Sequence, residues 1–306
     1  MKNKGVLYIL ACYILFGILP IYWKLLMTAD PYFVICNRVF WSIVVTLFLL
    51  FVKKQLPRIR QVFSDHKTML KLLLSGFLLV VNWAGYIIAV NTDHVIDASL
   101  AYYFTPIITI LLGRICFKER LAGLQVVAIF LATVGIISAF IFYGVVPWLA
   151  LIIGSSFAFY GAVKKTVQLD GVTSLTIECL WMLIPAIILC ICLVNRGQFA
   201  LPGETLTWWQ WLIIPTTGII TVVPLIIYAK GIQTVSYSLT GILMYINPTL
   251  QLLCGVFFFH EPFTRVHGIM FVFVWLSVAV YLFSTYMHAT NRSLTQDRKK
   301  HRRASV

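Results

Sequence analysis

The sequence contains few charged residues, and acidic residues are the scarcest of them. Only 11% of its 306 residues are charged and 60% are apolar, with 10 Asp and Glu against 24 Lys and Arg. An ordinary soluble domain has about 25% charged and about 45–50% apolar residues. A chain with so little charge cannot cover a water-exposed surface, which argues against an ordinary soluble protein.

Motifs of the common enzyme classes are also missing. The chain has no GxxxxGK[ST] phosphate loop, no HExxH, no GxSxG and no glycine-rich dinucleotide fingerprint. The six His residues lack metal-ligand spacing, and the seven Cys residues form no CxxC motif. We therefore expect neither an enzyme nor a metal or cofactor site, and we interpret the cysteines as small apolar packing residues.

The apolar residues gather in runs close to the ~20 residues that a helix needs to cross a bilayer. The runs lack the alternating pattern of a β-barrel, so helices are the expected spanning structure. We predict an all-α polytopic membrane protein with ten transmembrane helices near 6–27, 33–52, 68–89, 98–117, 121–142, 147–164, 172–194, 208–229, 236–259 and 264–287.

The basic residues lie mostly on one side of the predicted spans. With a cytoplasmic N-terminus, 20 of the 24 Lys and Arg residues fall on the cytoplasmic side, and only Lys24, Arg38, Arg196 and Arg265 do not. This asymmetry predicts that both termini are cytoplasmic. The basic tail, with RKKHRR at 298–303, is expected to contact anionic lipid headgroups rather than nucleic acid.

One internal repeat is visible in the fourth and ninth predicted spans. Tyr103, Pro106, Gly113 and Glu119 form the pattern YxxPxxxxxxGxxxxxE, and Tyr245, Pro248, Gly255 and Glu261 repeat it at a constant offset of 142 residues. Five predicted spans separate the two motifs, and this odd number places them on opposite sides of the membrane. The pattern therefore predicts two repeats of inverted topology, an architecture typical of secondary carriers.

These features divide the chain into a first five-helix repeat at 1–143, a second at 144–288 and a basic cytoplasmic tail at 289–306. A stripe of small residues runs along the fifth span: Ala128, Ala132, Gly135 and Ala139. Such a stripe favours close helix packing, either within the fold or in a homodimer.

Several polar and aromatic residues inside the predicted spans are candidates for a substrate site. Arg38, with Trp41 one turn on, lies about five residues from the outer end of its span, where it either faces a cavity or extends to the outer headgroups. Asn82, Trp83 and Tyr86 share one helix face. The repeat-related spans add Tyr103, Tyr245 and Asn247. Together they predict a pocket for a small, partly apolar molecule; the alternative is an interfacial aromatic belt with interhelical hydrogen bonds.

Glu178 is an acidic residue within the seventh predicted span. It is a candidate for proton coupling, because an intramembrane carboxylate changes charge readily unless it is paired. The alternative, equally favoured by the sequence, is an ion pair with Lys164 or Lys165.

The whole chain resembles the RarD-like branch of the EamA-type drug/metabolite transporter superfamily. The similarity rests on GVLYILACYILFGILPIYWK (5–24), NRVFWS (37–42), NWAGYIIAVNTDHVIDASLAYYFTP (82–106), SFAFYGAVKK (156–165), VPLIIYAKG (223–231) and GILMYINPTLQLL (241–253). The resemblance implies ten helices in two inverted EamA repeats, cytoplasmic termini and a bacterial inner-membrane location. The name of the branch carries an association with chloramphenicol.

The expected function is therefore a secondary transporter that exports a small organic metabolite or amphiphilic drug by alternating access, with proton coupling as an option. An uncoupled channel or facilitator is the first alternative, and a membrane accessory subunit is the second. The expected partners are a small-molecule substrate and the lipid bilayer.

Overall fold

The computed structural model of the 306-residue chain describes residues 2–91, 95–143, 148–195, 206–260 and 263–304. Within these ranges the regular structure is all α-helical, as the sequence predicts. The helices, in chain order, are α1 (Lys2–Lys24), α2 (Pro31–Val52), α3 (Leu56–Ser64), α4 (His66–Asn91), α5 (Val95–Ile115), α6 (Gly123–Tyr143), α7 (Trp148–Thr166), α8 (Gly171–Asn195), α10 (Trp208–Ile213), α11 (Thr216–Ile232), α12 (Tyr237–Leu243), α13 (Ile246–Phe259) and α14 (Arg265–Ala304).

Eight helical segments among the described residues are long and apolar enough to cross a membrane. The two remaining predicted spans correspond to α5 and α7. The described apolar part of α5, Ala101–Ile115, is shorter than a full span. The last turn of α7 carries Lys164 and Lys165, which lower the mean hydropathy of that helix.

Two of the long apolar segments are broken within their length. The break between α10 and α11 falls at Ile214 and Pro215, and the break between α12 and α13 falls at Met244 and Tyr245. Pro248 then lies in the first turn of α13. Backbone N–H groups in the first turn have no acceptor within the helix, so the N–H that proline lacks costs no helical hydrogen bond there. Broken helices at membrane depth are tolerated where they are buried in protein or line a cavity.

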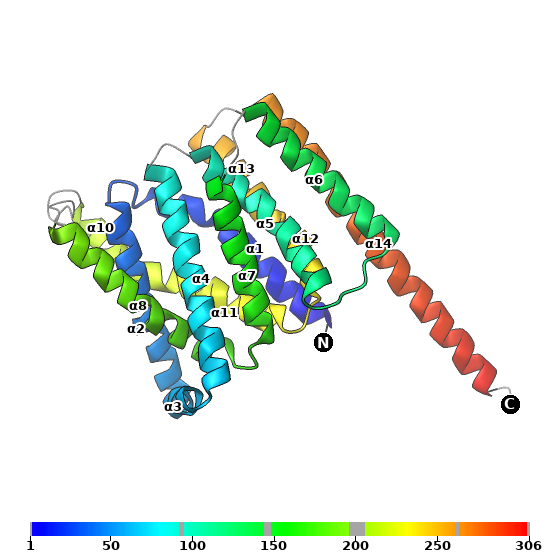
Figure 1. Cartoon of the computed structure of the whole chain (residues 1–306), viewed down its shortest axis with the longest axis horizontal. Coiled ribbons are helices and arrows are strands. Elements are labelled where there is room, and N and C mark those ends of the chain that lie inside the picture. Colours follow the sequence, from blue (N-terminus) through cyan, green and yellow to red (C-terminus); the bar gives the residue numbers. More distant parts are fainter. Residues whose placement is uncertain (1, 92–94, 144–147, 196–205, 261–262, 305–306) are drawn as a thin grey trace. The chain divides into compact units, whose positions relative to one another are not determined.

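The chain forms two compact units, and each contains helices from both halves of the sequence. The large unit comprises Met1–Phe117 and Pro147–Pro262, and the small unit comprises Lys118–Val146 and Phe263–Val306. In the large unit α4 and α5 both pack against α7, α2 packs against α8, and α1 packs against α11 and α13 (Figure 1).

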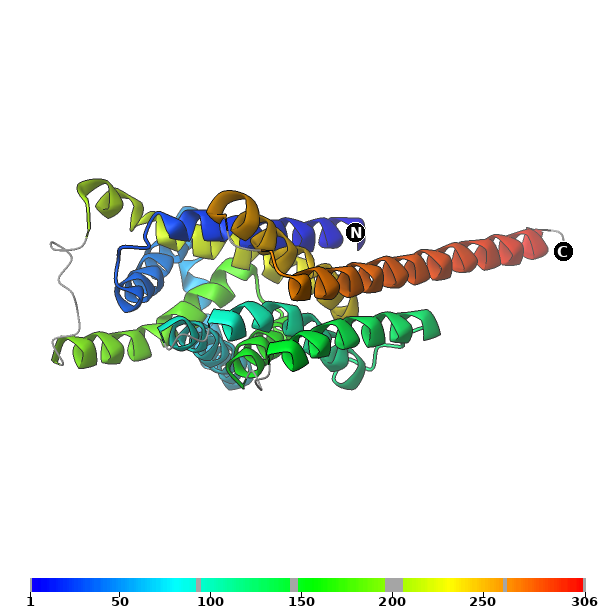
Figure 2. The same ribbon diagram turned by 90° about the horizontal axis from the view of Figure 1, so that it is seen from above.

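In the small unit α6 and α14 lie side by side (Figures 1 and 2). The predicted stripe of small residues forms their interface: Ala128, Ala132 and Ala139 are buried, and a Cβ at Gly135 would lie 2.6 Å from the Cβ of Phe273. The stripe therefore serves packing within the chain. The predicted tail continues α14 as a helix as far as Ala304.

Three of the few acidic residues cap helices. The carboxylates of Asp30, Asp65 and Asp170 accept hydrogen bonds from backbone N–H groups in the first turns of α2, α4 and α8. Hydrogen bonds from the hydroxyl and amide of Thr68 lower the pKa of Asp65. Burial raises the pKa of Asp170, but hydrogen bonds from Thr173 and Val172 together with the nearby Arg58 outweigh it, and the net shift is downward.

Candidate functional site

The large unit contains a cavity of about 670 Å³, within the range of about 300–1,000 Å³ found for sites of small organic ligands. Its wall combines helices from both halves of the sequence: α1, α2, α4 and α5 from the first, and α7, α11 and α13 from the second. Most of the lining side chains are apolar or aromatic. The described part of the wall contains two cations, Lys24 and Arg38, and no carboxylate.

Arg38 is the most constrained polar group of this wall. Its Nε donates a hydrogen bond of 2.8 Å to Oγ1 of Thr221 on α11. Its Cζ lies 4.2 Å from the ring centroid of Trp83 on α4 and 4.8 Å from that of Trp23 on α1. Three neighbouring helices therefore hold the guanidinium at the cavity. The sequence left open whether this residue faces a cavity or extends to the headgroups, and the structure places it in the cavity wall.

Amide side chains contribute the other fixed polar groups. Asn82 is 8% exposed, and its Nδ2 donates a hydrogen bond of 2.8 Å to the carbonyl of Ile153 on α7. This bond orients the side-chain oxygen independently of any ligand. On α13, Asn247 accepts a hydrogen bond of 2.8 Å from Nε2 of Gln251, and both residues line the cavity. Tyr86 and Tyr102 add two rings whose centroids are 6.3 Å apart.

Of the eight candidate substrate residues, the structure brings five together around the cavity: Arg38, Asn82, Trp83, Tyr86 and Asn247. The other three lie outside its wall. Trp41 packs against the cluster of Leu26, Ala29, Phe33 and Ile214. Tyr103 is buried and donates a hydrogen bond of 3.3 Å to the carbonyl of Pro248, and Tyr245 is fully buried at the break before α13.

The contact between Tyr103 and Pro248 joins the two copies of the repeated motif within the large unit. Of the motif's terminal glutamates, Glu119 lies between α5 and α6, and Glu261 lies outside the described residues.

Sequence reasoning missed several aromatic residues of the wall. They are Phe16 and Trp23 on α1, Tyr102 on α5, Phe157 on α7 and Phe259 on α13. Trp23 lies beside Lys24, which the sequence identifies only as a basic residue outside the cytoplasmic side. Tyr102 directly precedes Tyr103 and faces the cavity in its place. Neither residue carries a motif that would distinguish it from the many aromatic residues of the spans.

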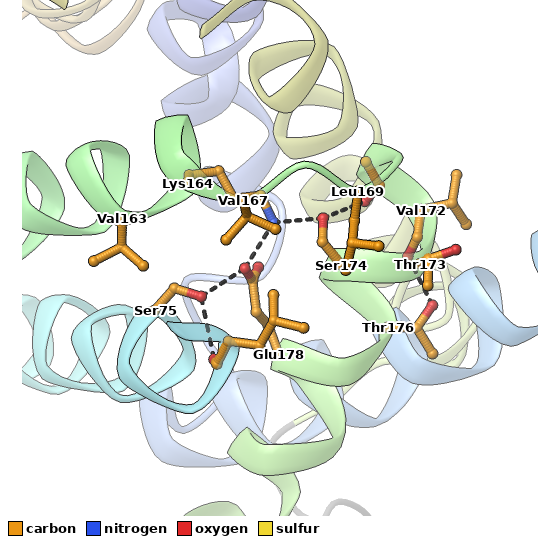
Figure 3. A network of polar contacts seen from close by, with 12 residues as sticks. Ser75, Val163, Lys164, Val167, Leu169, Val172, Thr173, Ser174, Thr176 and Glu178 are labelled. Atoms are coloured by element: carbon orange, nitrogen blue, oxygen red, sulfur yellow. Dashed lines mark hydrogen bonds and ion pairs between the residues drawn. The ribbon is translucent and has the colours of Figure 1, made fainter. Parts of the chain in front are cut away.

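A second polar cluster lies in the large unit where α7, α8 and α4 meet (Figure 3). Nζ of Lys164 lies 2.7 Å from Oε1 of Glu178, and the two side chains are 1% and 0% exposed. Lys164 also donates to Oγ of Ser174 at 2.9 Å, and Ser75 donates to Oε1 of Glu178 at 2.6 Å. The structure thus shows the ion-pair alternative for Glu178, with Lys164 as the partner.

The second cation of this segment has another role. Nζ of Lys165 donates to the carbonyl of Ile232, the last residue of α11, and to that of Val235 just after it. The other oxygen of Glu178, Oε2, is buried and has no hydrogen-bond partner among the described residues.

A layer of aromatic residues connects the cavity to this ion pair. Phe157, which lines the cavity, has its ring centroid 5.7 Å from that of Tyr160 and 5.8 Å from that of Tyr228. The rings of Tyr160 and Tyr228 are stacked at 6.2 Å, and Nζ of Lys164 lies 5.8 Å from the centroid of Tyr160. The cavity therefore ends on packed rings, and the ion pair lies beyond them.

Comparison with known proteins places this arrangement in a family. The EamA-like transporter family matches residues 3–141 and again 146–283. The chain is 34% identical over 285 residues to an uncharacterized transporter of Bacillus subtilis, YojE, covering 92% of this chain and 94% of that protein. It is 32% identical over 280 residues to the protein RarD of Salmonella typhi, covering 92% and 95%.

A more distant relative, the chloramphenicol-sensitive protein RarD of Pseudomonas aeruginosa, is 27% identical over 282 residues and covers 91% of this chain and 93% of that protein. A solved crystal structure of a protein with 16% sequence identity shares the fold, with a TM-score of 0.71 over 92% of this chain and 98% of that one.

The resemblance inferred from the sequence is thus confirmed. The members of this family are transporters and not enzymes, and the named relatives are bacterial. With eight segments fit to span a bilayer in its described part and two matched repeats, the chain is a multi-pass membrane transporter that belongs to the EamA-like transporter family.

Proposed function

We propose that the protein is a secondary transporter that exports a small organic metabolite or amphiphilic drug across the bacterial inner membrane. In this proposal ten helices form two inverted repeats with cytoplasmic termini, and rocking of the repeats alternates access to the cavity. The observation that carries the proposal is the cavity itself: a space of about 670 Å³ whose wall takes helices from both repeats. A site shared between repeats is the arrangement that alternating access requires.

The position of the cavity supports this function. Its wall includes the last residues of α1 and the first residues of α2, which flank the loop predicted to face outward. Towards the other ends of the helices, packing is tight: a Cβ at Gly161 would come within 2.6 Å of the hydroxyl of Tyr237. We assign this conformation to the outward-facing state of the cycle.

The test is transport by the purified protein in proteoliposomes. A carrier gives saturable flux, and substrate on one side accelerates the movement of labelled substrate from the other. Flux that rises linearly with concentration, without this counterflow, would instead favour the uncoupled channel or facilitator. A stable co-purifying partner together with an absence of flux would favour the accessory subunit.

We also propose that protons drive the export through the Lys164–Glu178 pair. The pair is buried, and its charges are compensated by each other and by Ser75 and Ser174. Adding one proton to Glu178 would leave Lys164 without its counter-charge, and a buried unpaired charge costs several kcal/mol. Protonation would therefore alter the contact between α7 and α8 strongly enough to favour another conformation of the bundle.

The test of coupling is the variant Glu178→Gln, assayed with and without an imposed pH gradient. Loss of the gradient's effect, with flux retained under counterflow conditions, supports the coupling role. An unchanged response to the gradient in a folded variant removes Glu178 from the mechanism.

A further inference from the structure

Arg38 is a cation of the cavity wall that has no acidic partner among the described residues. Neither of the ion pairs Arg58–Asp170 and Lys164–Glu178 involves Arg38. The groups that interact electrostatically with Arg38 are Tyr102, Tyr86, Tyr22 and Cys179, all of them neutral at physiological pH. An Arg within a membrane bundle is normally paired with a carboxylate or with backbone carbonyls, because an unpaired charge there is costly.

The contacts of Arg38 with described residues involve its Nε and the plane of its guanidinium. Thr221 accepts the hydrogen bond from Nε, and the rings of Trp23 and Trp83 form cation–π contacts with the guanidinium. No hydrogen bond of either terminal nitrogen to another described residue is present. Those N–H groups form the planar fork that binds a carboxylate through two parallel hydrogen bonds.

The rest of the wall fits the body of such a ligand. Phe16, Tyr102 and Phe157 supply aromatic surface, and Asn82 holds a side-chain oxygen that can accept one hydrogen bond. The described wall contains no carboxylate that would repel an anion or attract a cation.

From this geometry we infer that the cavity selects organic anions: small molecules with a carboxylate, or an acid of similar shape, attached to a flat apolar body. In this inference Arg38 binds the acid group, and Thr221 and the two Trp residues position Arg38. The aromatic side chains of the wall pack against the apolar body of the ligand. The inference rests on the proposed function, since it names the substrate class of the same cavity.

The test compares ligands that differ only in charge. Indole-3-acetate and benzoate are paired with their neutral amides, indole-3-acetamide and benzamide, and binding to the purified full-length protein in detergent is measured by ligand-induced thermal stabilisation. The variants are Arg38→Met, Arg38→Lys and Thr221→Val. Arg60→Met serves as the control, because it removes an exposed Arg on α3 away from the cavity.

We expect the wild type and Arg60→Met to bind at least one acid more tightly than its amide. Hydrogen bonds to charged groups contribute about 1.5–3 kcal/mol, so Arg38→Met should weaken binding of the acid about 10- to 100-fold and leave binding of the amide little changed. Arg38→Lys keeps the charge but loses the fork, so its affinity should fall between the two. Thr221→Val, which affects only the positioning of Arg38, should lower the preference for acid over amide by a smaller factor.

Three results would overturn the inference: equal binding of acid and amide by the wild type, an acid preference that survives Arg38→Met, or binding of neither member of any pair. The proposed function is tested separately by counterflow. Saturable flux of a neutral drug such as chloramphenicol, not inhibited by the acids and unaffected by Arg38→Met, would uphold the transporter and refute the anion site. Acid binding that depends on Arg38, without flux of any ligand, would uphold the anion site and refute the transporter.

Discussion

Lys164 on α7 and Glu178 on α8 form an ion pair of 2.7 Å in which neither side chain exposes more than 1% of its surface. The two residues are 14 positions apart, joined by the short connection that follows α7. The pair therefore links α7 and α8 directly. Its energetic role follows from the desolvation of both charges, which only the partner and the two serines offset.

Removing one member of this pair should be far more harmful than removing both. We expect Lys164→Met and Glu178→Gln each to lower the free energy of unfolding by about 3–5 kcal/mol, because each leaves a buried charge unpaired or a polar group unsatisfied. The double variant should recover most of that loss. Unfolding in detergent measures the three changes, with Lys230→Met, which removes an exposed Lys, as the control. If the stability loss of the double variant equals the sum of the losses of the two single variants, the coupling between the two residues is refuted.

Gly218 on α11 allows the backbones of α11 and α2 to come close together. A Cβ at this position would lie 2.5 Å from the carbonyl oxygen of Trp41 and 2.8 Å from the backbone nitrogen of Ser42. Because those atoms belong to the backbone, the helices themselves would have to separate. We expect Gly218→Ala to lower stability by about 1–3 kcal/mol, as overpacking does.

The matched control for this change is Gly123→Ala, since a Cβ at Gly123 meets nothing within 4 Å. That change should be neutral or stabilising by up to about 1 kcal/mol. Thermal unfolding of the two variants side by side measures the difference. Equal stability of both would contradict the close approach of α11 to Trp41.

Asp170 should make the stability of α8 depend on pH. Its pKa in the folded protein lies below the unfolded value of about 3.9, so its contribution is fully present above that value and is lost as pH falls through the folded pKa. Asp170→Asn keeps a capping oxygen but loses the charge, so it should be less stable than the wild type near neutral pH by about 0.3–1 kcal/mol, the usual contribution of a negative charge at a helix N-terminus. The gap should close below about pH 4.

Melting temperatures of both proteins across pH 3–7 measure this effect. Thr173→Val is the companion variant, because its hydroxyl donates a hydrogen bond of 2.6 Å to Oδ2 of Asp170. A constant gap between Asp170→Asn and the wild type at all pH values would show that the charge of this carboxylate is not involved.

Cys36 on α2 and Cys190 on α8 have their sulfur atoms 2.7 Å apart. A mild oxidant such as diamide should take two electrons and two protons from the thiols and leave a disulfide between the helices, with the diamide reduced to its hydrazine. Peptide mass spectrometry without reduction should find this cross-link. The link should be absent in Cys36→Ser and in Cys190→Ser and retained in Cys12→Ser. If oxidation links other cysteines instead, the two thiols are not adjacent in the protein.

Much of the fold could be predicted from the sequence. The scarce charge and the length of the apolar runs predicted membrane-spanning helices, and the repeated motif predicted two repeats. The breaks at Met244–Tyr245 and Ile214–Pro215 could not be located from the sequence, because Pro215 lies at a break whereas Pro185 and Pro224 lie inside continuous helices. What decides such a break is the packing of neighbouring helices, and that is a property of the folded chain.

The candidate site could likewise be predicted only in part. Asn82, Trp83 and Tyr86 could be grouped because residues three and four apart share a helix face. The choice between Tyr102 and Tyr103, or between Lys164 and Lys165, could not be made, because adjacent residues point about 100° apart and the sequence does not tell which direction the cavity takes. Trp23 was missed for a related reason: its contact with Arg38 is made between helices.

The guanidinium of Arg38, which has no acidic partner among the described residues, also has an electrical consequence. If the substrate is a monoanion, the loaded cavity carries one positive charge less than the empty cavity, whose described wall holds the cations Lys24 and Arg38. The buried pair of Lys164 and Glu178 adds no net charge as long as Glu178 is deprotonated. In a cell with a negative interior, the membrane potential would pull the empty site back to the cytoplasmic side, by up to about 2.3 kcal/mol per 100 mV. Export would then be electrogenic, and the membrane potential would add to the driving force that protons supply.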